Sequence, residues 1–176
     1  MSAQAAVYAG TDLIGMIFAE SKRQISTSEA KLIRSLIPHG SFEASKFQTN
    51  VIDNAWILKQ YMNKGMTGFV GVFMNQSVSY INAVCEEVGL DFVQLHGSEP
   101  QDFIDQIHRP VIHVIHVDGN CCIENLIEAA LRVRNVAAIL LDTKTSSGSG
   151  GTGMTFDWSL AARLDSLGVS CLDFLF

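Results

Sequence analysis

The feature that most constrains the fold is a regular alternation of short apolar runs with stretches of helical periodicity. The apolar runs have the length and composition of strands that are buried on both faces, and they lie at residues 12–18, 68–73, 91–95, 111–117 and 136–141. Helices are expected between and around them, at residues 2–9, 27–37, 77–88, 99–108, 123–133 and 157–167. Buried strands joined by helices predict an α/β domain with a parallel sheet and helices outside it.

Two architectures fit this alternation, an open doubly wound sheet and a β/α barrel. In both, right-handed crossovers bring the carboxyl ends of the strands to one side, where the following loops build a site. The alternation is interrupted at about residues 39–66, which we interpret as an insertion within one domain that spans residues 1–176. The apolar residues 169–176 are expected to form one more strand.

Composition excludes several partners. The net charge is −6 and no Lys/Arg-rich run occurs, so nucleic acid and anionic membrane surfaces are not expected partners. No apolar run approaches the roughly 20 residues that a membrane span requires, and the first residues do not resemble a secretory signal. Four cysteines without a C-x-x-C pair fit a reducing compartment. We expect a cytoplasmic protein, or a plastid protein if the source is a plant or alga.

The carboxyl ends of the expected strands carry specific local sequences. These are SKRQIS at 21–26, VGVFMNQ at 70–76, DFVQLHGSEP at 91–100 and LLDTKTSSGSGGTGMTFDW at 140–158. Together, in this order, they resemble the phosphoribosylanthranilate isomerases of tryptophan biosynthesis. The resemblance implies an incomplete (β/α)8 TIM barrel of about five to six parallel strands.

The resemblance also implies a reaction and a set of site residues. Members of this family carry out an Amadori rearrangement of N-(5-phosphoribosyl)anthranilate with an Asp as acid and a Cys as base, without a metal or cofactor. Asp142 matches the acid, and Arg23 matches the residue that pairs with the anthranilate carboxylate. The expected substrate-binding residues are completed by Gln94, His96, Gly150, Gly151 and Gly153.

The sequence departs from the family pattern in two respects. It contains no K-x-C-G motif, which carries the base in the family, and no AGG or D-V-S-S-G motif, whose backbone binds the substrate phosphate. We therefore expect these 176 residues to be truncated at both ends of the barrel and to have little isomerase activity by themselves. Open barrel edges invite pairing with another chain, so self-association is expected. The alternative is a non-catalytic binding or scaffold protein derived from the barrel.

Two further patterns suggest other sites. Gly148, Gly150 and Gly153 fit the G-x-G-x-x-G fingerprint of a dinucleotide-binding domain, but six residues separate the motif from the preceding strand. His113 and His116 lie in one apolar run. Because residues three apart in a strand face opposite sides, we expect them to be structural and not metal ligands.

Overall fold

The computed structural model describes residues 3–37, 67–118, 123–144 and 171–172, and it confirms the alternation of strands and helices. In chain order the elements are α1 (Ala3–Tyr8), β1 (Leu13–Ile17), α2 (Thr27–Ser35), β2 (Gly68–Phe73), α4 (Val78–Val88), β3 (Phe92–Leu95), α5 (Gln101–Ile104), β4 (Val111–Asp118), α6 (Ile123–Arg132), β5 (Ala138–Lys144) and β6 (Cys171–Leu172). The predicted insertion at 39–66 and helix at 157–167 lie outside the described residues. None of the described helices is long and apolar enough to cross a membrane.

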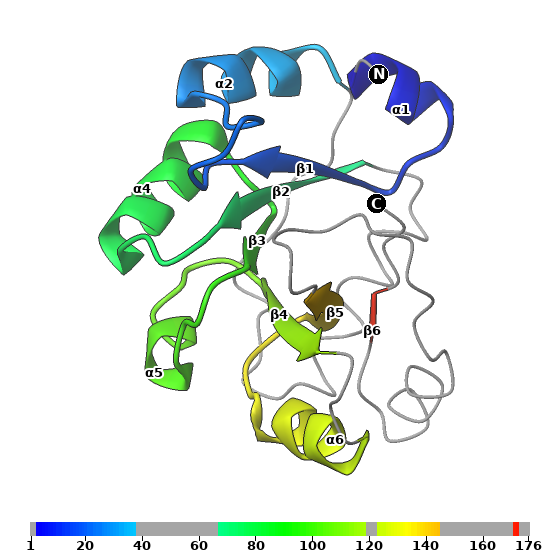
Figure 1. Ribbon diagram of the computed structural model, residues 1–176. Helices are drawn as coiled ribbons and strands as arrows, with labels where there is room; N and C mark the ends of the chain where they lie inside the picture. Colours follow the sequence, from blue (N-terminus) through cyan, green and yellow to red (C-terminus); the bar gives the residue numbers. More distant parts are fainter. Residues whose placement is uncertain (1–2, 38–66, 119–122, 145–170, 173–176) are drawn as a thin grey trace.

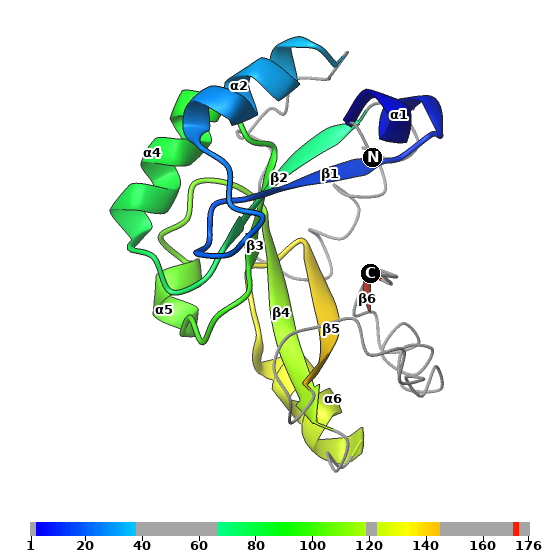
Figure 2. The same ribbon diagram turned by 45° about the horizontal axis from the view of Figure 1, so that its top comes forward.

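The strands form one parallel sheet whose spatial order, β1-β2-β3-β4-β5-β6, is the order of the chain. A doubly wound sheet reverses its strand order at a switch point, whereas a β/α barrel adds each strand beside the previous one. Helices α2, α4, α5 and α6 accordingly follow one convex face of a curving sheet (Figures 1 and 2). The fold is an incomplete β/α barrel, and the sheet lacks the strand order expected of a dinucleotide-binding domain.

Strand residues alternate between two apolar layers because successive side chains of a strand point to opposite faces. The outer layer packs between the sheet and the helices and includes Phe69, Val93 and Ile139. The inner layer faces the barrel axis and consists of the buried residues Val70, Phe92, Ile112, Val114, Ala138 and Leu140. Both faces of the sheet are therefore buried, which explains the nearly continuous apolar runs in the sequence.

Residue-level signals fix where several elements begin and end. Ser26 begins α2 with a capping box, in which its side chain accepts a hydrogen bond from the Glu29 N–H and the Glu29 carboxylate accepts one from the Ser26 N–H. Gly89 ends α4 with φ +77°, a left-handed conformation that favours glycine.

One predicted helix is wrong in its extent. Residues 99–108 were expected to be helical, but α5 spans only Gln101–Ile104. The Glu99 carboxylate accepts hydrogen bonds from the Gly97 N–H in the preceding loop and from the Asn75 N–H in the loop after β2. Beyond Ile104, the N–H groups of Gln106 and Ile107 bond to carbonyls three residues back, so the chain tightens into turns.

A buried carboxylate ties the start of β3 to its neighbours. Asp91 is 2% exposed, and its Oδ2 accepts a hydrogen bond from the Phe69 N–H at 2.9 Å. The Arg34 Nη1 lies 3.6 Å from the same oxygen, and the guanidinium stacks over the Phe69 ring, 5.2 Å from its centroid. Asp91 thus joins β3, β2 and α2 through one side chain.

We predict that Asp91→Ala lowers the free energy of unfolding by about 3 kcal/mol, because it leaves a buried N–H and a largely buried guanidinium without this partner. Urea denaturation measures the change. Asp102→Ala, at an exposed position on α5, is the matched control and should change stability by less than about 0.5 kcal/mol. Equal effects of the two substitutions would contradict the role given to Asp91.

His113 lies on the outer face of β4, in the same row as Val111 and Ile115, and its Nδ1 is buried without a hydrogen-bond partner. Burial lowers the pKa of His113 from its ordinary value near 6.5; the neighbouring Glu99 partly opposes this shift, and His116 adds to it. The unfolded chain consequently binds a proton at this residue more readily than the folded chain.

Stability should therefore be greatest above about pH 6.5 and fall as the pH drops below it, by at most about 1.4 kcal/mol per pH unit for one such histidine. Urea denaturation between pH 7.5 and pH 5.5, values chosen to bracket about 6.5, tests this. His113→Gln should make the fall smaller. An unchanged pH dependence in that variant would show that His113 does not contribute.

Candidate functional site

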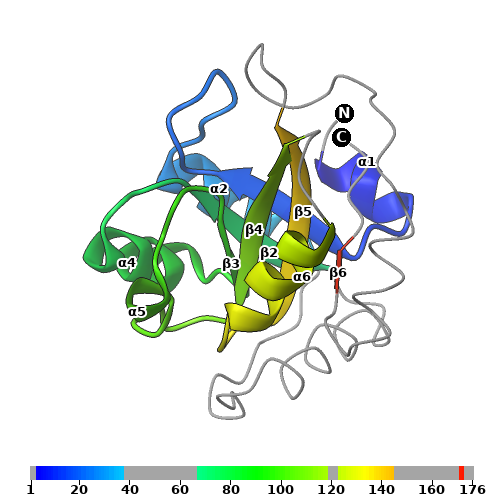
Figure 3. The same ribbon diagram turned by 60° about the horizontal axis from the view of Figure 1, so that its bottom comes forward.

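The inner layer changes from apolar to polar at the carboxyl ends of three neighbouring strands. On β4 the inner row continues from Ile112 and Val114 to His116, and on β5 it continues from Leu140 to Asp142. His116 and Asp142 are direct partners in the parallel register of β4 and β5. His96 follows β3 immediately, two residues after the buried Gln94. The pairing of the sheet thus delivers three titratable side chains to one end of the barrel. Figure 3 shows β4 and β5, the strands that carry His116 and Asp142, side by side.

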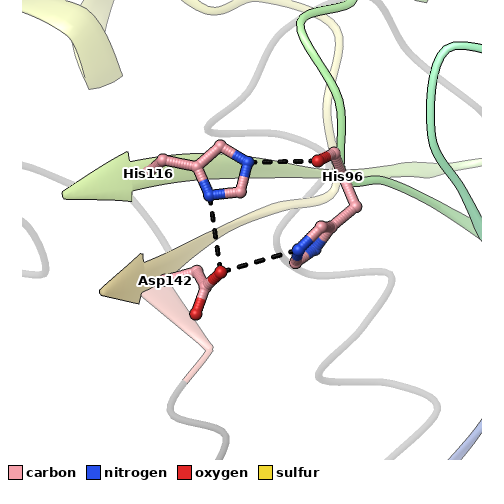
Figure 4. Close-up of side chains that lie close together, drawn as sticks. All are labelled: His96, His116 and Asp142. Carbon is pink, nitrogen blue, oxygen red and sulfur yellow. Dashed lines mark hydrogen bonds and ion pairs between the residues drawn. The ribbon is translucent and has the colours of Figure 1, made fainter. Parts of the chain in front are cut away.

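These three side chains converge on one carboxylate oxygen (Figure 4). Asp142 Oδ2 lies 3.4 Å from His116 Nδ1 and 3.5 Å from His96 Nε2. The two imidazole rings meet edge to face, with centroids 5.0 Å apart and an interplanar angle of 83°. The second carboxylate oxygen of Asp142 points away from both rings.

The hydrogen bonds of His116 define its protonation pattern. Its Nε2 lies 3.1 Å from the backbone carbonyl oxygen of His96, which can only accept, so Nε2 carries the hydrogen. In a neutral ring Nδ1 is then an acceptor. This Nδ1 is buried and has no hydrogen-bond partner, although Asp142 Oδ2 is close. Two lone-pair-bearing atoms face one another unless a positive charge lies between them.

The surroundings of His96 favour the neutral form of its ring. Burial lowers its pKa from the ordinary value near 6.5, His116 lowers it further, and Asp142 and Glu99 oppose these effects. Its Nδ1 lies 3.5 Å from Gln94 Nε2, an amide donor. This pairing leaves the hydrogen of His96 on Nε2, directed toward Asp142.

Two loops at this end of the barrel are joined beneath the site. The buried Glu99 carboxylate accepts hydrogen bonds from the Asn75 N–H at 2.7 Å and the Gly97 N–H at 2.9 Å. Asn75, at φ 60°, returns a side-chain acceptor to the Ser98 N–H at 3.0 Å. A Cβ on Gly97 would lie 2.3 Å from Asn75 Oδ1, so this position requires glycine. The loop that carries His96 is therefore fixed by side chains, not only by the strand.

The residues expected from the sequence are only partly brought together. Asp142, His96 and Gln94 share the site, while Arg23 is exposed in the loop after β1, at the same end of the sheet. Gly150, Gly151 and Gly153 lie outside the described residues. His116 was expected to be structural, but it contacts Asp142. Its alternation with Ile112 and Val114 was the sequence signal for an inward-facing position.

Chemically, the cluster offers one carboxylate flanked by two imidazoles. Such an arrangement can hold a proton on one side of the carboxylate and present the other oxygen to a ligand. Among the described residues, the same three side chains place possible ligand atoms close enough together to hold a metal ion.

Comparison with known proteins identifies the relatives of this chain. Residues 37–169 match the family described as N-(5'phosphoribosyl)anthranilate (PRA) isomerase. The N-(5'-phosphoribosyl)anthranilate isomerase of Dehalococcoides mccartyi is 33% identical over 159 residues, covering 88% of this chain and 62% of that protein. A multifunctional tryptophan biosynthesis protein of Schizosaccharomyces pombe is 34% identical over 166 residues, covering 92% of this chain and 21% of that protein.

Solved structures agree with the sequence relatives. The crystal structure of phosphoribosyl anthranilate isomerase from Thermotoga maritima is 30% identical, with a TM-score of 0.67 over 93% of this chain and 66% of that chain. A further isomerase structure, in complex with reduced 1-(o-carboxyphenylamino)-1-deoxyribulose 5-phosphate, is 25% identical, with a TM-score of 0.60 over 93% of this chain and 64% of that chain. This chain thus spans less than two thirds of the sequence relatives named above. It belongs to the N-(5'-phosphoribosyl)anthranilate isomerase family.

Proposed function

We propose that this chain supplies the acid side of an isomerase site for N-(5-phosphoribosyl)anthranilate, with Asp142 as the catalytic acid. The observation that carries the proposal is the placement of Asp142 at the inner, carboxyl-terminal end of β5. One of its oxygens faces His96 and His116, and the other points away from them. Active sites of β/α barrels lie at this end of the strands.

The proposed reaction begins at the ribose ring oxygen. Asp142 donates a proton to this oxygen as the C1–O bond breaks, and the lone pair of the anthranilate nitrogen forms the C=N bond of a Schiff base. A base then removes the proton from C2, and the electrons form an enolamine. The enolamine becomes the ketone of the carboxyphenylamino-deoxyribulose phosphate. After the first step the Asp142 carboxylate is an anion, which the neighbouring His96 Nε2–H stabilises.

The remaining residues would bind the substrate. Arg23 is exposed at the carboxyl-terminal end of the barrel, where a planar guanidinium suits the anthranilate carboxylate. Gln94 and His96 would line the site, and Gly150, Gly151 and Gly153 would belong to the loop that covers the substrate. The related structure that binds reduced 1-(o-carboxyphenylamino)-1-deoxyribulose 5-phosphate supports a phosphorylated sugar–anthranilate ligand of this kind.

The base of the reaction is not among the proposed residues. The sequence contains no K-x-C-G motif, and of its four cysteines Cys85 is buried on α4, where burial raises the pKa of the thiol to about 12. Cys85 is therefore unsuited to act as a base at neutral pH. We propose that efficient turnover requires a barrel segment that carries the base.

The experiment compares the chain as it stands with a version joined to the flanking segments of the Dehalococcoides mccartyi isomerase. Loss of anthranilate fluorescence from fresh substrate measures turnover, with a chelator present throughout. We expect slow turnover by the chain as it stands and measurable turnover by the joined version. Asp142→Asn should reduce the latter about 10²- to 10⁴-fold, the usual contribution of a general acid.

The matched control is His113→Gln, which alters β4 on the opposite face and should leave turnover within about twofold. Full activity of the Asp142→Asn variant would contradict the assignment of the acid. Rapid turnover by the chain as it stands, lost in Asp142→Asn, would preserve the acid and contradict the need for a separate base segment.

A further inference from the structure

The cluster of His96, His116 and Asp142 has the donor atoms of a metal site. A carboxylate that only donates a proton does not require them. One nitrogen of each imidazole and one carboxylate oxygen lie within 4.8 Å of one another. Two imidazoles and one carboxylate form the donor set of many mononuclear zinc and iron sites. The three residues come from or directly follow adjacent parallel strands, so the sheet holds their backbones rigidly.

The spacing of these atoms fits a tetrahedral ion. With metal–ligand distances of about 2.0–2.1 Å, tetrahedral ligands lie about 3.3–3.4 Å apart. The observed separations from Asp142 Oδ2 are 3.4 Å to His116 Nδ1 and 3.5 Å to His96 Nε2. The third separation, between the two ring nitrogens, is at most 4.8 Å, so the His96 ring, the more exposed of the two, would have to rotate to bring it to the tetrahedral value.

The surroundings of His116 match those of a metal ligand. A ligating histidine normally donates its other ring N–H to a carbonyl or carboxylate, which fixes the ring and its tautomer. His116 Nε2 donates to the His96 carbonyl at 3.1 Å, which leaves the Nδ1 lone pair directed at the cluster. That Nδ1 is buried and lacks a hydrogen-bond partner, a costly state that either a proton or a metal ion between Nδ1 and Asp142 Oδ2 would relieve.

The cluster is also accessible. The side chains of His96, His116 and Asp142 are 32%, 23% and 24% exposed. An ion can therefore enter from the carboxyl-terminal end of the barrel and retain water as a fourth ligand, as in open zinc sites.

We propose that His96 Nε2, His116 Nδ1 and Asp142 form a binding site for one Zn²⁺ ion. Binding requires the hydrogen of His96 to move from Nε2 to Nδ1, where the Gln94 side chain, turned so that its amide oxygen faces the ring, accepts it. Binding would occupy the Asp142 oxygen and neutralise the carboxylate that the proposed function uses as the acid. Zinc should therefore inhibit the isomerase reaction, and this consequence alone rests on the proposed function.

The test is a zinc titration of the chelator-stripped protein by isothermal titration calorimetry, with Co²⁺ absorption spectroscopy as a second readout. We expect one ion per chain and the intense visible bands of tetrahedral Co²⁺. His116→Gln places an amide where Nε2 lies and preserves a donor to the His96 carbonyl, but it removes the Nδ1 ligand. It should weaken zinc binding by more than about tenfold, because loss even of an outer-shell partner costs about 10- to 100-fold.

His113→Gln is the matched control, since it removes a histidine of the same strand that faces away from the cluster, and it should leave zinc binding unchanged. Circular dichroism would establish that both variants fold. Absence of stoichiometric binding, an octahedral Co²⁺ spectrum, or equal zinc affinity in wild type and His116→Gln would each overturn the proposal. The zinc-binding results do not depend on the acid role of Asp142, because they are read from calorimetry and Co²⁺ absorption. Turnover is measured separately with a chelator present, so bound zinc does not affect that test.

Discussion

The parallel pairing of β4 with β5 is the constraint on which the rest of the site depends. Its register sets His116 beside Asp142, and the two-residue period of each strand then assigns every neighbour to a face. Ile112, Val114 and Leu140 fill the barrel interior below the pair. The site is therefore the uppermost level of the inner layer, where the apolar residues end. A shift of β5 by one residue against β4 would turn Asp142 toward the helices and away from His116.

The outer layer and the loops maintain this arrangement from two sides. Helices α2 and α4 bury the outer faces of the first strands, and the Asp91 carboxylate joins β3 to the Phe69 backbone beside Arg34. At the carboxyl-terminal end, Glu99 binds the backbone of Asn75 and Gly97, so the loop that follows β3 cannot move independently of the loop that follows β2. The position of His96 depends on this contact.

Much of the fold could be predicted from periodicity, because a sheet buried on both faces requires continuous apolar runs. Periodicity could not distinguish a barrel from a doubly wound sheet, because the two differ in strand order, which is a long-range property. The family motifs identified Asp142 and His96 as neighbours of the site. They did not identify His116, whose role follows only from its register with β5. The predicted start of α5 was wrong because the Glu99 side chain binds the Asn75 backbone in the loop after β2, a tertiary contact that helical periodicity does not reveal.

His96 and His116 meet over Asp142 inside the barrel, while His113 faces the helices. A nuclear Overhauser experiment on the protein with assigned histidine ring protons tests it most directly. We expect a cross-peak between the His96 and His116 rings, whose centroids lie 5.0 Å apart, and cross-peaks from His113 to outer-layer side chains. A cross-peak from His96 to the His113 ring in place of the His116 ring would contradict the register and the site built on it.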